Sequence, residues 1–329
     1  MTTQGETNAA MSKGETSGYY LGVDGGGTQT TAVLLRCEPP HAPTVVGRGS
    51  AGASNLLTAG ADDALQQLDL AIDRAFAAAN LPRQAALAAC LAIAGSGRPS
   101  VRDAIATWAR DNRVALRTHV VTDVEALLSA RSSGESVVPA TIALISGTGS
   151  IAWGRDATGR EARAGGWGSL LGDEGSGYAL VVSALRAITR AADEAVPLPA
   201  YAASLLEELG VVDLPELPAK LARMSRHEIA RLATPLCTRF AENEVAVLLD
   251  DVAVQLARLV ICVARKLQLS EDDYELVLGG GVLNGVLSLQ QQLLVQLAAA
   301  DLRPHSTRCL TDVAGEAARL AVTLAGMNP

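Results

Sequence analysis

The sequence predicts an α/β protein with two domains, on three observations. The chain has 329 residues, and domains usually hold roughly 100 to 200 residues each. Apolar segments of strand type alternate with segments of helical periodicity. A strand–turn–strand arrangement also occurs twice, near Tyr19 and again near Thr141, which indicates a duplicated fold.

The first half of the chain reads as three paired strands followed by alternating helices and strands. Short alternating apolar segments predict the strands. The first helix follows from apolar residues at helical spacing, Leu65, Leu68, Ile72 and Phe76, and from the Asn80-Leu81-Pro82 stop. In order, the expected elements are strands over 19–23, 30–36 and 43–48, a helix over 62–79, a strand over 87–94, a helix over 101–110 and a strand over 116–121.

The second half repeats the opening and then becomes mostly helical. Four prolines between Leu198 and Pro235 predict short helical pieces there, in a variable insertion. The expected elements are strands over 141–146 and 151–154, a helical stretch over 180–269, a strand over 275–278, and helices over 282–300 and 312–325.

Composition excludes several classes of protein. The formal net charge is −8, and without a Lys/Arg cluster we expect no nucleic-acid partner. The longest charge-free stretches, 136–154 and 276–300, are broken by polar residues, so we expect no membrane span. Residues 1–18 are polar without an apolar core, which predicts a disordered lead rather than a signal peptide.

Metal-ligand spacing is absent from the cysteines and histidines. The five cysteines are scattered and odd in number, so we expect no disulfide framework or zinc site but buried thiols in a reducing cytoplasm. They are Cys37, Cys90, Cys237, Cys262 and Cys309. His227-Glu228 lacks a second histidine at zinc-binding spacing, and a solvated helix face is expected there.

The first glycine-rich turn, Val23-Asp24-Gly25-Gly26-Gly27-Thr28, joins two expected strands. Glycines permit positive φ and let backbone N–H groups approach an anion. Asp24 could hold a hydrated Mg²⁺, and Thr28 could donate to a phosphate. The alternative is a plain Asp-Gly hairpin turn, although such a turn needs no third glycine.

The second glycine-rich turn, Ser146-Gly147-Thr148-Gly149-Ser150, also joins two strands. Two such turns facing each other would hold a polyphosphate from both sides. The commoner phosphate loops do not fit, because no GxxxxGK[ST] occurs and GxGxxG fails at Ala152. A Walker-type hydrolase and a dinucleotide-binding dehydrogenase are therefore disfavoured.

Thr122-Asp123-Val124-Glu125 directly follows an apolar strand. A carboxylate at the carboxyl end of a strand is well placed to accept a proton from a substrate hydroxyl. Thr122 and Glu125 are also spaced as a capping box, which would make Asp123 an ordinary first-turn acid. The spacing alone leaves both interpretations open.

Residues 165–177 combine many glycines with Trp167, Asp173 and Glu174. Such a segment suits hydrogen bonding to a polyhydroxylated ligand, and a mobile surface loop is the alternative.

A last motif, Leu278-Gly279-Gly280-Gly281, leads from a strand into a helix. It would let a base or ribose lie against the backbone, and tight strand–helix packing is the alternative.

Taken in order, these motifs resemble the BadF/BadG/BcrA/BcrD ATPase family, and more narrowly its N-acetylglucosamine and glucosamine kinases within the actin-like sugar kinase superfamily. The resemblance runs from about Tyr19 to Ala325. It implies two ribonuclease H-like (actin-like ATPase) domains flanking a nucleotide and sugar cleft. The implied domains are 19–121 plus 309–329, with the last helix crossing back, and 122–308 with the helical insertion.

The resemblance also implies a role for each matched residue. The residues implied for ATP are Asp24, Gly25, Gly26, Gly27, Thr28, Thr122, Gly147, Thr148, Gly149, Ser150, Gly279, Gly280 and Gly281, with Mg²⁺ held by Asp24 through water. The residues implied for the sugar are Asn55, Gly166, Trp167, Gly168 and Asp173.

One departure from the family affects the choice of base. Mammalian-type kinases of this group carry an aspartate in the turn after the strand matching 87–94, whereas this chain reads Ala94-Gly95-Ser96-Gly97. Asp123, where hexokinase-type enzymes keep a catalytic carboxylate, is therefore the expected base.

The expected function is ATP- and Mg²⁺-dependent phosphorylation of the 6-hydroxyl of N-acetylglucosamine or glucosamine, by a cytoplasmic homodimer. Two alternatives remain open. One is an ATP-hydrolysing activator of an acyl-CoA dehydratase or reductase, although the closely placed cysteines of an iron–sulfur site are missing. The other is a non-catalytic sugar sensor, although the 18 polar residues before Tyr19 cannot form a helix-turn-helix.

Overall fold

A computed structural model describes residues 17–39, 41–129, 138–240 and 242–326. The disordered lead expected for 1–18 lies almost entirely outside them. The chain divides into two compact units. Unit 1 runs up to Ala126 and resumes at Asp312, and unit 2 comprises Leu127–Thr311.

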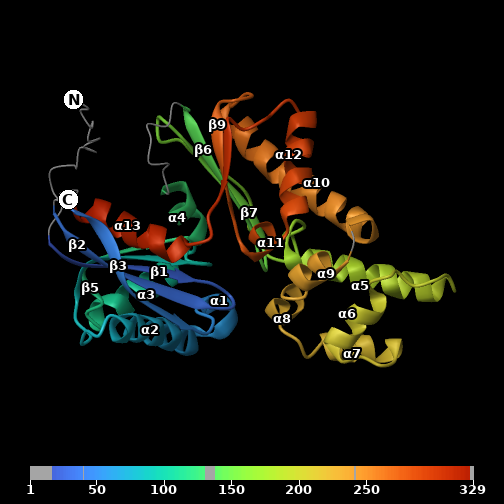
Figure 1. The fold of residues 1–329 in the computed structure, drawn as a ribbon, viewed down its shortest axis with the longest axis horizontal. Helices are drawn as coiled ribbons and strands as arrows, with labels where there is room; N and C mark the ends of the chain where they lie inside the picture. Colours follow the sequence, from blue (N-terminus) through green and yellow to red (C-terminus); the bar gives the residue numbers. More distant parts are fainter. Residues whose placement is uncertain (1–16, 40, 130–137, 241, 327–329) are drawn as a thin grey trace, which may run out of the picture. The chain divides into compact units, whose positions relative to one another are not determined.

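Unit 1 is built on a five-stranded mixed sheet in the order β3-β2-β1-β4-β5 (Figure 1). The strands are β1 (Gly18–Gly25), β2 (Thr30–Glu38), β3 (His41–Ala51), β4 (Ala86–Ile93) and β5 (Ala115–Val121). The first three pair antiparallel, and β4 and β5 add in parallel on the other side of β1. This arrangement confirms the three paired strands expected from the sequence.

Helices cover both faces of the unit 1 sheet (Figure 1). The helices α2 (Ala61–Ala78) and α3 (Pro99–Asp111) pack on one face, and α13 (Val313–Gly326) packs on the other. Successive side chains of β1 point to opposite faces of the sheet. Leu21 and Val23 therefore pack on the face covered by α2 and α3, and Tyr20 packs on the face covered by α13. Two short helices, α1 (Leu56–Ala59) and α4 (Asp123–Ser129), follow β3 and β5.

Unit 2 repeats the topology of unit 1. Its strands are β6 (Ala140–Ser146), β7 (Ser150–Asp156), β8 (Glu161–Gly165), β9 (Tyr274–Gly279) and β10 (Ser306–Cys309). From one edge the order is β8-β7-β6-β9-β10, with an antiparallel first trio and two parallel additions. The duplicated fold expected from the sequence is therefore confirmed.

The core of unit 2 is formed by its sheet and by α5 (Gly177–Asp193), α10 (Glu242–Leu267) and α12 (Leu287–Ala299), and it extends into the segment between α5 and α10. A further helix, α11 (Gly281–Gly285), follows β9.

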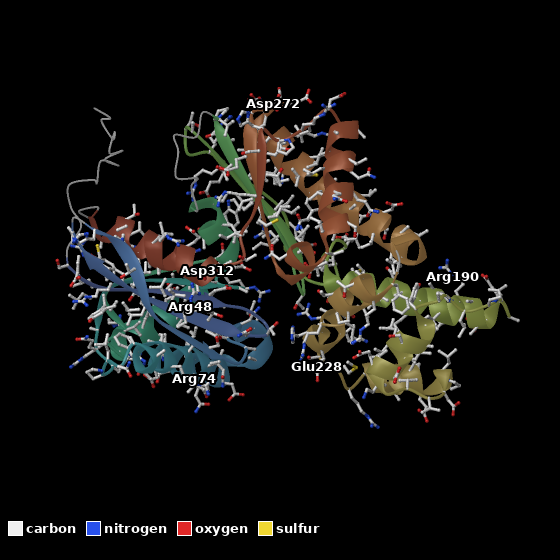
Figure 2. The ribbon with its side chains drawn as sticks, viewed as in Figure 1. Arg48, Arg74, Arg190, Glu228, Asp272 and Asp312 are labelled. Carbon is white, nitrogen blue, oxygen red and sulfur yellow. The ribbon has the colours of Figure 1, made fainter. Side chains whose placement is uncertain are left out.

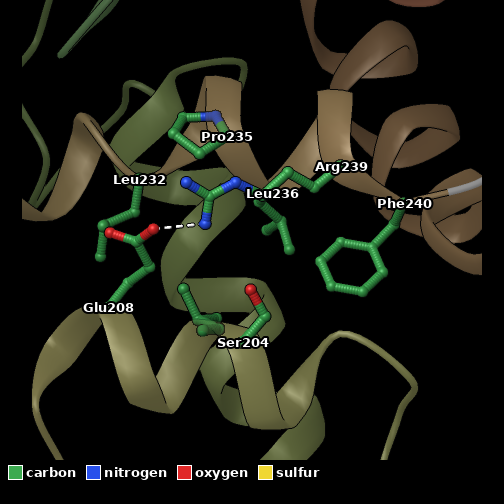
Figure 3. A pocket seen from close by; sticks show the side chains of 8 residues that line it. Ser204, Glu208, Leu232, Pro235, Leu236, Arg239 and Phe240 are labelled. Carbon is green, nitrogen blue, oxygen red and sulfur yellow. Dashed lines mark hydrogen bonds and ion pairs between the residues drawn. The ribbon is translucent and has the colours of Figure 1, made fainter.

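Between α5 and α10 lies the helical insertion, with α6 (Ala202–Leu209), a 3₁₀ turn over Leu214–Glu216, α7 (Leu217–Leu221), α8 (Arg226–Ala230) and α9 (Ala233–Arg239). Arg239 of α9 pairs with Glu208 of α6 beside a small pocket (Figure 3), and the Tyr201 and Phe240 rings meet edge-on with centroids 6.4 Å apart. These contacts hold the end of α9 against α6.

Several sequence expectations need correction. The strands β8 and β10 were not expected, because β8 is short and β10 is mostly exposed. The helix expected over 282–300 is interrupted at Val286, whose extended backbone (φ −126°, ψ 90°) separates α11 from α12. Cys37 and Cys90 are buried as expected, but Cys237 and Cys262 are half-buried and Cys309 is exposed. No helix among the described residues is long and apolar enough to cross a membrane.

Candidate active site

The first glycine turn, Asp24–Thr28, is held by segments that follow β3 and β4. The carbonyl of Gly26 accepts from the amides of Ser54 and Asn55 at 3.0 and 3.2 Å. The amide of Ala94 donates to the carbonyl of Gly25 at 2.8 Å. Asn55 and the turn after β4 are therefore brought next to the glycine turn within unit 1.

The backbone of this turn differs from the expectation of positive φ. None of Gly25, Gly26 and Gly27 has a positive φ. A Cβ at Gly25 would instead crowd Ile93 and the hydroxyl of Ser54, whereas one at Gly27 would meet nothing within 4 Å. The glycines therefore leave space beside the turn because they have no side chains, and they do not serve to allow a left-handed backbone.

Asn55 caps a helix, in addition to the sugar contact that the family resemblance implies. Its Oδ1 accepts from the amide of Leu57 at 3.0 Å and caps α1. A Cβ on Gly95 would lie 3.0 Å from the same oxygen, so Asn55 packs against the Gly95-Ser96-Gly97 turn. A Cβ on Gly97 would make only an ordinary 3.6 Å contact with Thr122.

Asp123 is the first residue of α4 and is half-buried. The capping box exists: the Thr122 amide donates to Glu125 Oε2 at 2.6 Å, and the Glu125 amide donates to Thr122 Oγ1 at 3.1 Å. Burial raises the pKa of Asp123, against the hydrogen bonds from its own amide and from Val124. The two sequence interpretations are therefore compatible, because the box fixes the helix start that carries the carboxylate.

Two carboxylates of unit 1 act on a third, Asp24. Burial first, and then the negative charges of Asp123 and Asp312, raise the pKa of Asp24 to about 7. Burial, and to a lesser degree the two neighbouring carboxylates, therefore disfavour the ionised form of Asp24. An oxygen ligand in such surroundings suits a hard divalent cation such as Mg²⁺.

Two arginines brace this region, and sequence reasoning missed both. Arg102 of α3 donates to the carbonyl of Ser96 at 3.2 Å and to Glu125 Oε2 at 3.3 Å, which ties the turn after β4 to α4. Arg48 of β3 donates to both carboxylate oxygens of Asp312 at 2.9 and 2.5 Å (Figure 2). Asp312 also accepts from the amide of Gly315 at the start of α13.

The second glycine turn, Gly147–Ser150, is fixed at both ends within unit 2. The Gly147 amide donates to the carbonyl of Gly149 at 2.9 Å, and the Gly147 carbonyl accepts from the amide of Gly177 at 2.8 Å. The Ser150 amide donates to Asp173 Oδ1 at 3.1 Å. The Ser150 hydroxyl is buried without a hydrogen-bond partner among the described atoms, which is unusual for a buried polar group.

Asp173 supports the second turn directly. It has left-handed backbone (φ 65°) and is 6% exposed. Burial raises its pKa, while the Ser150 amide and the charge of Arg226 lower it. The Asp173 carboxylate thus stabilises the second glycine turn through the Ser150 amide, and the expected sugar role does not explain this hydrogen bond.

Trp167 belongs to the same segment, 165–177, as Asp173, and its side chain is 66% exposed. The guanidinium of Arg163 lies 5.1 Å from its ring centre. Gly166 and Gly168 on either side have positive φ, of 68° and 82°. The ring therefore lies in a turn that glycine allows without strain, and it offers a flat apolar surface.

The Gly279–Gly281 motif lies against the second turn. Gly280 has a φ of 92°, and a Cβ there would collide with the backbone of Ser146. A Cβ on Gly147 would lie 4.0 Å from the amide of Gly281. The glycine run therefore packs closely on the end of β6, which brings Gly279–Gly281 beside the second glycine turn.

His227 makes a contact that sequence reasoning missed. Its Nδ1 lies 3.2 Å from Oγ1 of Thr148, at the tip of the second glycine turn. The neighbouring Arg226 donates to Ser169 Oγ at 2.9 Å, within the loop that carries Trp167. His227 lies on a helix and Glu228 is exposed, as expected, but the histidine is half-buried beside the second glycine turn. No local pattern links residues 79 positions apart.

The sequence-predicted residues therefore form two groups. In unit 1 the structure gathers Asp24–Thr28, Asn55, Thr122 and Asp123. In unit 2 it gathers 147–150, 166–168, Asp173 and 279–281. Their ligand roles stay predictions.

The sequence profile of the BadF/BadG/BcrA/BcrD ATPase family matches residues 21–298. An N-acetylmuramic acid/N-acetylglucosamine kinase of Clostridium acetobutylicum is 27% identical over 273 residues, which cover 82% of this chain and 86% of the relative. An N-acetyl-D-glucosamine kinase of Dictyostelium discoideum is 27% identical over 286 residues, covering 82% and 87%.

Solved structures show the same fold. A Chromobacterium violaceum protein, provisionally identified as an N-acetylglucosamine kinase, superposes with a TM-score of 0.71 at 26% identity, covering 93% of this chain and 99% of that one. A Streptomyces griseus ROK family glucokinase, solved with glucose and AMPPNP, gives a TM-score of 0.59 at 18% identity, covering 93% and 100%. The fold is therefore that of the actin-like sugar kinases.

Proposed function

We propose that this chain, which belongs to the BadF/BadG/BcrA/BcrD ATPase family, is an ATP-dependent amino-sugar kinase. In the proposal it acts on the 6-hydroxyl of N-acetylglucosamine. One observation carries the proposal. Each unit presents a glycine turn between the first two strands of the same sheet topology, and in unit 1 that turn is accompanied by the carboxylate of Asp123. The two relatives named for N-acetylglucosamine support the substrate.

Asp123 is the proposed base. Phosphoryl transfer needs positioning and charge neutralisation more than covalent help. A base works best when its pKa approaches the operating pH, and burial moves the pKa of Asp123 upward in that direction. In the proposal its carboxylate orients the sugar hydroxyl and accepts its proton as the phosphoryl group transfers.

The nucleotide is assigned to the glycine turns. Gly25–Thr28 and Gly147–Ser150 would hold the phosphates through backbone N–H groups and hydroxyls, with Thr122 beside the first turn and Gly279–Gly281 facing the adenosine. The open space at Gly27 and the unpartnered Ser150 hydroxyl favour this assignment.

Mg²⁺ is assigned to Asp24 through water, and it would neutralise phosphate charge. Burial raises the pKa of Asp24 most and the charges of Asp123 and Asp312 add to it, and a divalent cation beside Asp24 would favour its ionised form. The metal would thereby offset the repulsion between the phosphates and the neighbouring carboxylates.

The sugar is assigned to Asn55, Gly166, Trp167, Gly168 and Asp173. The exposed Trp167 ring offers an apolar face for the sugar ring. Asn55 Oδ1 also accepts from the Leu57 amide and Asp173 Oδ1 from the Ser150 amide, so in the proposal each side chain has a structural contact as well as a sugar contact.

A coupled assay of ADP release tests the proposal. N-acetylglucosamine, glucosamine, N-acetylmuramic acid and glucose are offered separately, with and without Mg²⁺. We expect ADP release that requires both Mg²⁺ and N-acetylglucosamine, with sugar 6-phosphate as product. Sugar-independent ATP hydrolysis would instead indicate the activator class, and ligand binding without turnover would indicate a sensor.

We further propose a cytoplasmic homodimer. Free thiols at five scattered cysteines suit a reducing compartment, and the family resemblance supports the dimer. Sedimentation equilibrium is expected to give twice the chain mass, and a monomer at micromolar concentration would reject the dimer.

A further inference from the structure

The second glycine turn has one polar side chain at its tip, and the helical insertion contacts it. The hydrogen bonds of Gly147 and Ser150 fix both ends of the turn. Thr148 projects between them, with Oγ1 3.2 Å from Nδ1 of His227. His227 lies on α8, well separated from the turn in sequence.

The position of α8 is determined by packing rather than by this contact alone. Ile229 and Ala230 are buried in the core of unit 2. A Cβ on Gly177 would lie 3.1 Å from the carbonyl of Ala230, so α8 packs closely on the start of α5. A capping box at Ser225 and Glu228 fixes the first turn of α8. His227 therefore stands on a rigid support.

The charge on the His227 imidazole determines how many hydrogen-bond donors and acceptors the ring has. Burial and the positive charge of Arg231 lower the pKa of His227, against an opposing effect of Glu228, so the ring is neutral at pH 7. A neutral imidazole has one N–H donor and one acceptor. A donor at Nδ1 would occupy a lone pair of the Thr148 hydroxyl and turn its proton elsewhere.

We propose that His227 is a positioning residue of the nucleotide site: its Nδ1–H donates to Thr148 Oγ1, which directs the threonine hydroxyl proton to a phosphate oxygen of ATP. The inference rests on the proposed function, because it needs ATP at the Gly147–Ser150 turn. It makes the helical insertion part of the nucleotide site.

The test compares substitutions at His227 that keep or remove a donor at the Nδ1 position. His227→Ala removes it. His227→Asn places an amide N–H near the Nδ1 position, whereas His227→Gln places one nearer to Nε2. His305→Ala, an exposed histidine of the same unit, is the control. The measurements are KM for ATP, KM for N-acetylglucosamine, kcat, and calorimetric affinity for Mg-AMPPNP.

We expect His227→Ala to weaken Mg-AMPPNP affinity and raise KM for ATP by about 3- to 30-fold, as fits partial loss of a hydrogen bond to a charged group. KM for N-acetylglucosamine stays unchanged. His227→Asn recovers most of the loss and His227→Gln does not, while His305→Ala behaves as wild type. On a Thr148→Val background, His227→Ala adds no further loss.

Unchanged AMPPNP affinity in folded His227→Ala would overturn the inference, as would an additive effect with Thr148→Val or an equal rise in both KM values. If His227→Ala does not fold, equal affinities of the Asn and Gln variants overturn it. Wild-type protein that binds no AMPPNP refutes the proposed function itself. Normal wild-type binding with unaffected His227 variants refutes only the inference.

Discussion

At the scale of single residues, burial disfavours the ionised form of Asp123 and raises its pKa. The Thr122–Glu125 capping box nevertheless holds this carboxylate at the start of α4. A carboxylate whose folded pKa lies above its unfolded value costs stability at every pH above the unfolded value, because folding disfavours the ionised form. Such a cost is typical of groups retained for chemistry rather than for folding.

We expect Asp123→Asn to lose about 100- to 10,000-fold in kcat, the usual contribution of a positioned base. The same variant is expected to melt at or above the wild-type temperature at pH 7, because the buried charge is removed. Steady-state kinetics and thermal unfolding measure the two effects, with Asp103→Asn on the exposed side of α3 as control. Near wild-type turnover in a folded Asp123→Asn protein would show that another group is the base.

Residues of the candidate site were predictable where a local motif marked them. The glycine turns and Thr122-Asp123-Val124-Glu125 are visible because their spacing is local. His227, Arg102 and Arg48 were not predictable, since their contacts join residues brought together only by the fold. The capping box was visible too, but spacing could not show that it and a reactive carboxylate coexist.

At the scale of elements, β1 and α13 approach closely because Gly22 has no side chain. A Cβ there would collide with the backbone carbonyl of Ala314 and amide of Ala318. We expect Gly22→Ala to lower the free energy of unfolding by about 1 to 3 kcal/mol, the usual cost of overpacking. Denaturant titration measures it. Gly27→Ala, where a Cβ meets nothing within 4 Å, should unfold as wild type does, and equal losses in both variants would refute the packing argument.

The Arg48–Asp312 pair joins β3 to the start of α13 and makes stability depend on pH. The hydrogen bond from Arg48 is the largest cause that lowers the pKa of Asp312. A carboxylate with a lowered folded pKa stabilises the fold above its unfolded pKa, and this contribution disappears as the pH falls through the folded value.

We expect Arg48→Met to lower stability at pH 7 by at most about 1 kcal/mol, because the pair is partly exposed. The difference from wild type should shrink as the pH falls below about 4, the ordinary range of a carboxyl group. Melting temperatures from pH 3 to 7 measure this, with Arg110→Met in the exposed Arg110–Asp111 pair as control. A difference independent of pH would exclude the carboxylate as its origin.

Most elements were predictable from periodicity, and the two missed strands have a physical explanation. The β8 strand buries only Ala162, and β10 has three exposed positions out of four. Neither carries the apolar signal that marks a strand. The duplication itself held the missing information, because β8 and β10 occupy the places of β3 and β5 in the second sheet.

At the scale of the whole molecule, unit 1 is assembled from both ends of the described chain. The α13 residues Ala314, Ala317, Ala318 and Ala321 are buried against one face of its sheet. Without α13 that face would expose Tyr20, Val33 and Leu35 to water.

We therefore expect a chain ending at Thr311 to lose cooperative unfolding and to aggregate, although it keeps every element of unit 2. Circular dichroism melting and size-exclusion chromatography test this. Deletion of 1–16, for which the sequence predicts disorder, is the control and should leave the melting temperature unchanged. A soluble, cooperatively melting chain without α13 would refute the structural role given to that helix.

The division of the chain also sets the order in which its parts can be completed during translation. A ribosome working along this sequence makes all of unit 2 before it reaches α13. Domains usually finish folding in the order of synthesis, the N-terminal one first. Here the order is reversed: unit 2 can close while the sheet that carries Asp24 still lacks the helix covering one face. In that interval the growing chain exposes the apolar sheet face that α13 later covers, and exposed apolar surface of this kind is prone to aggregation.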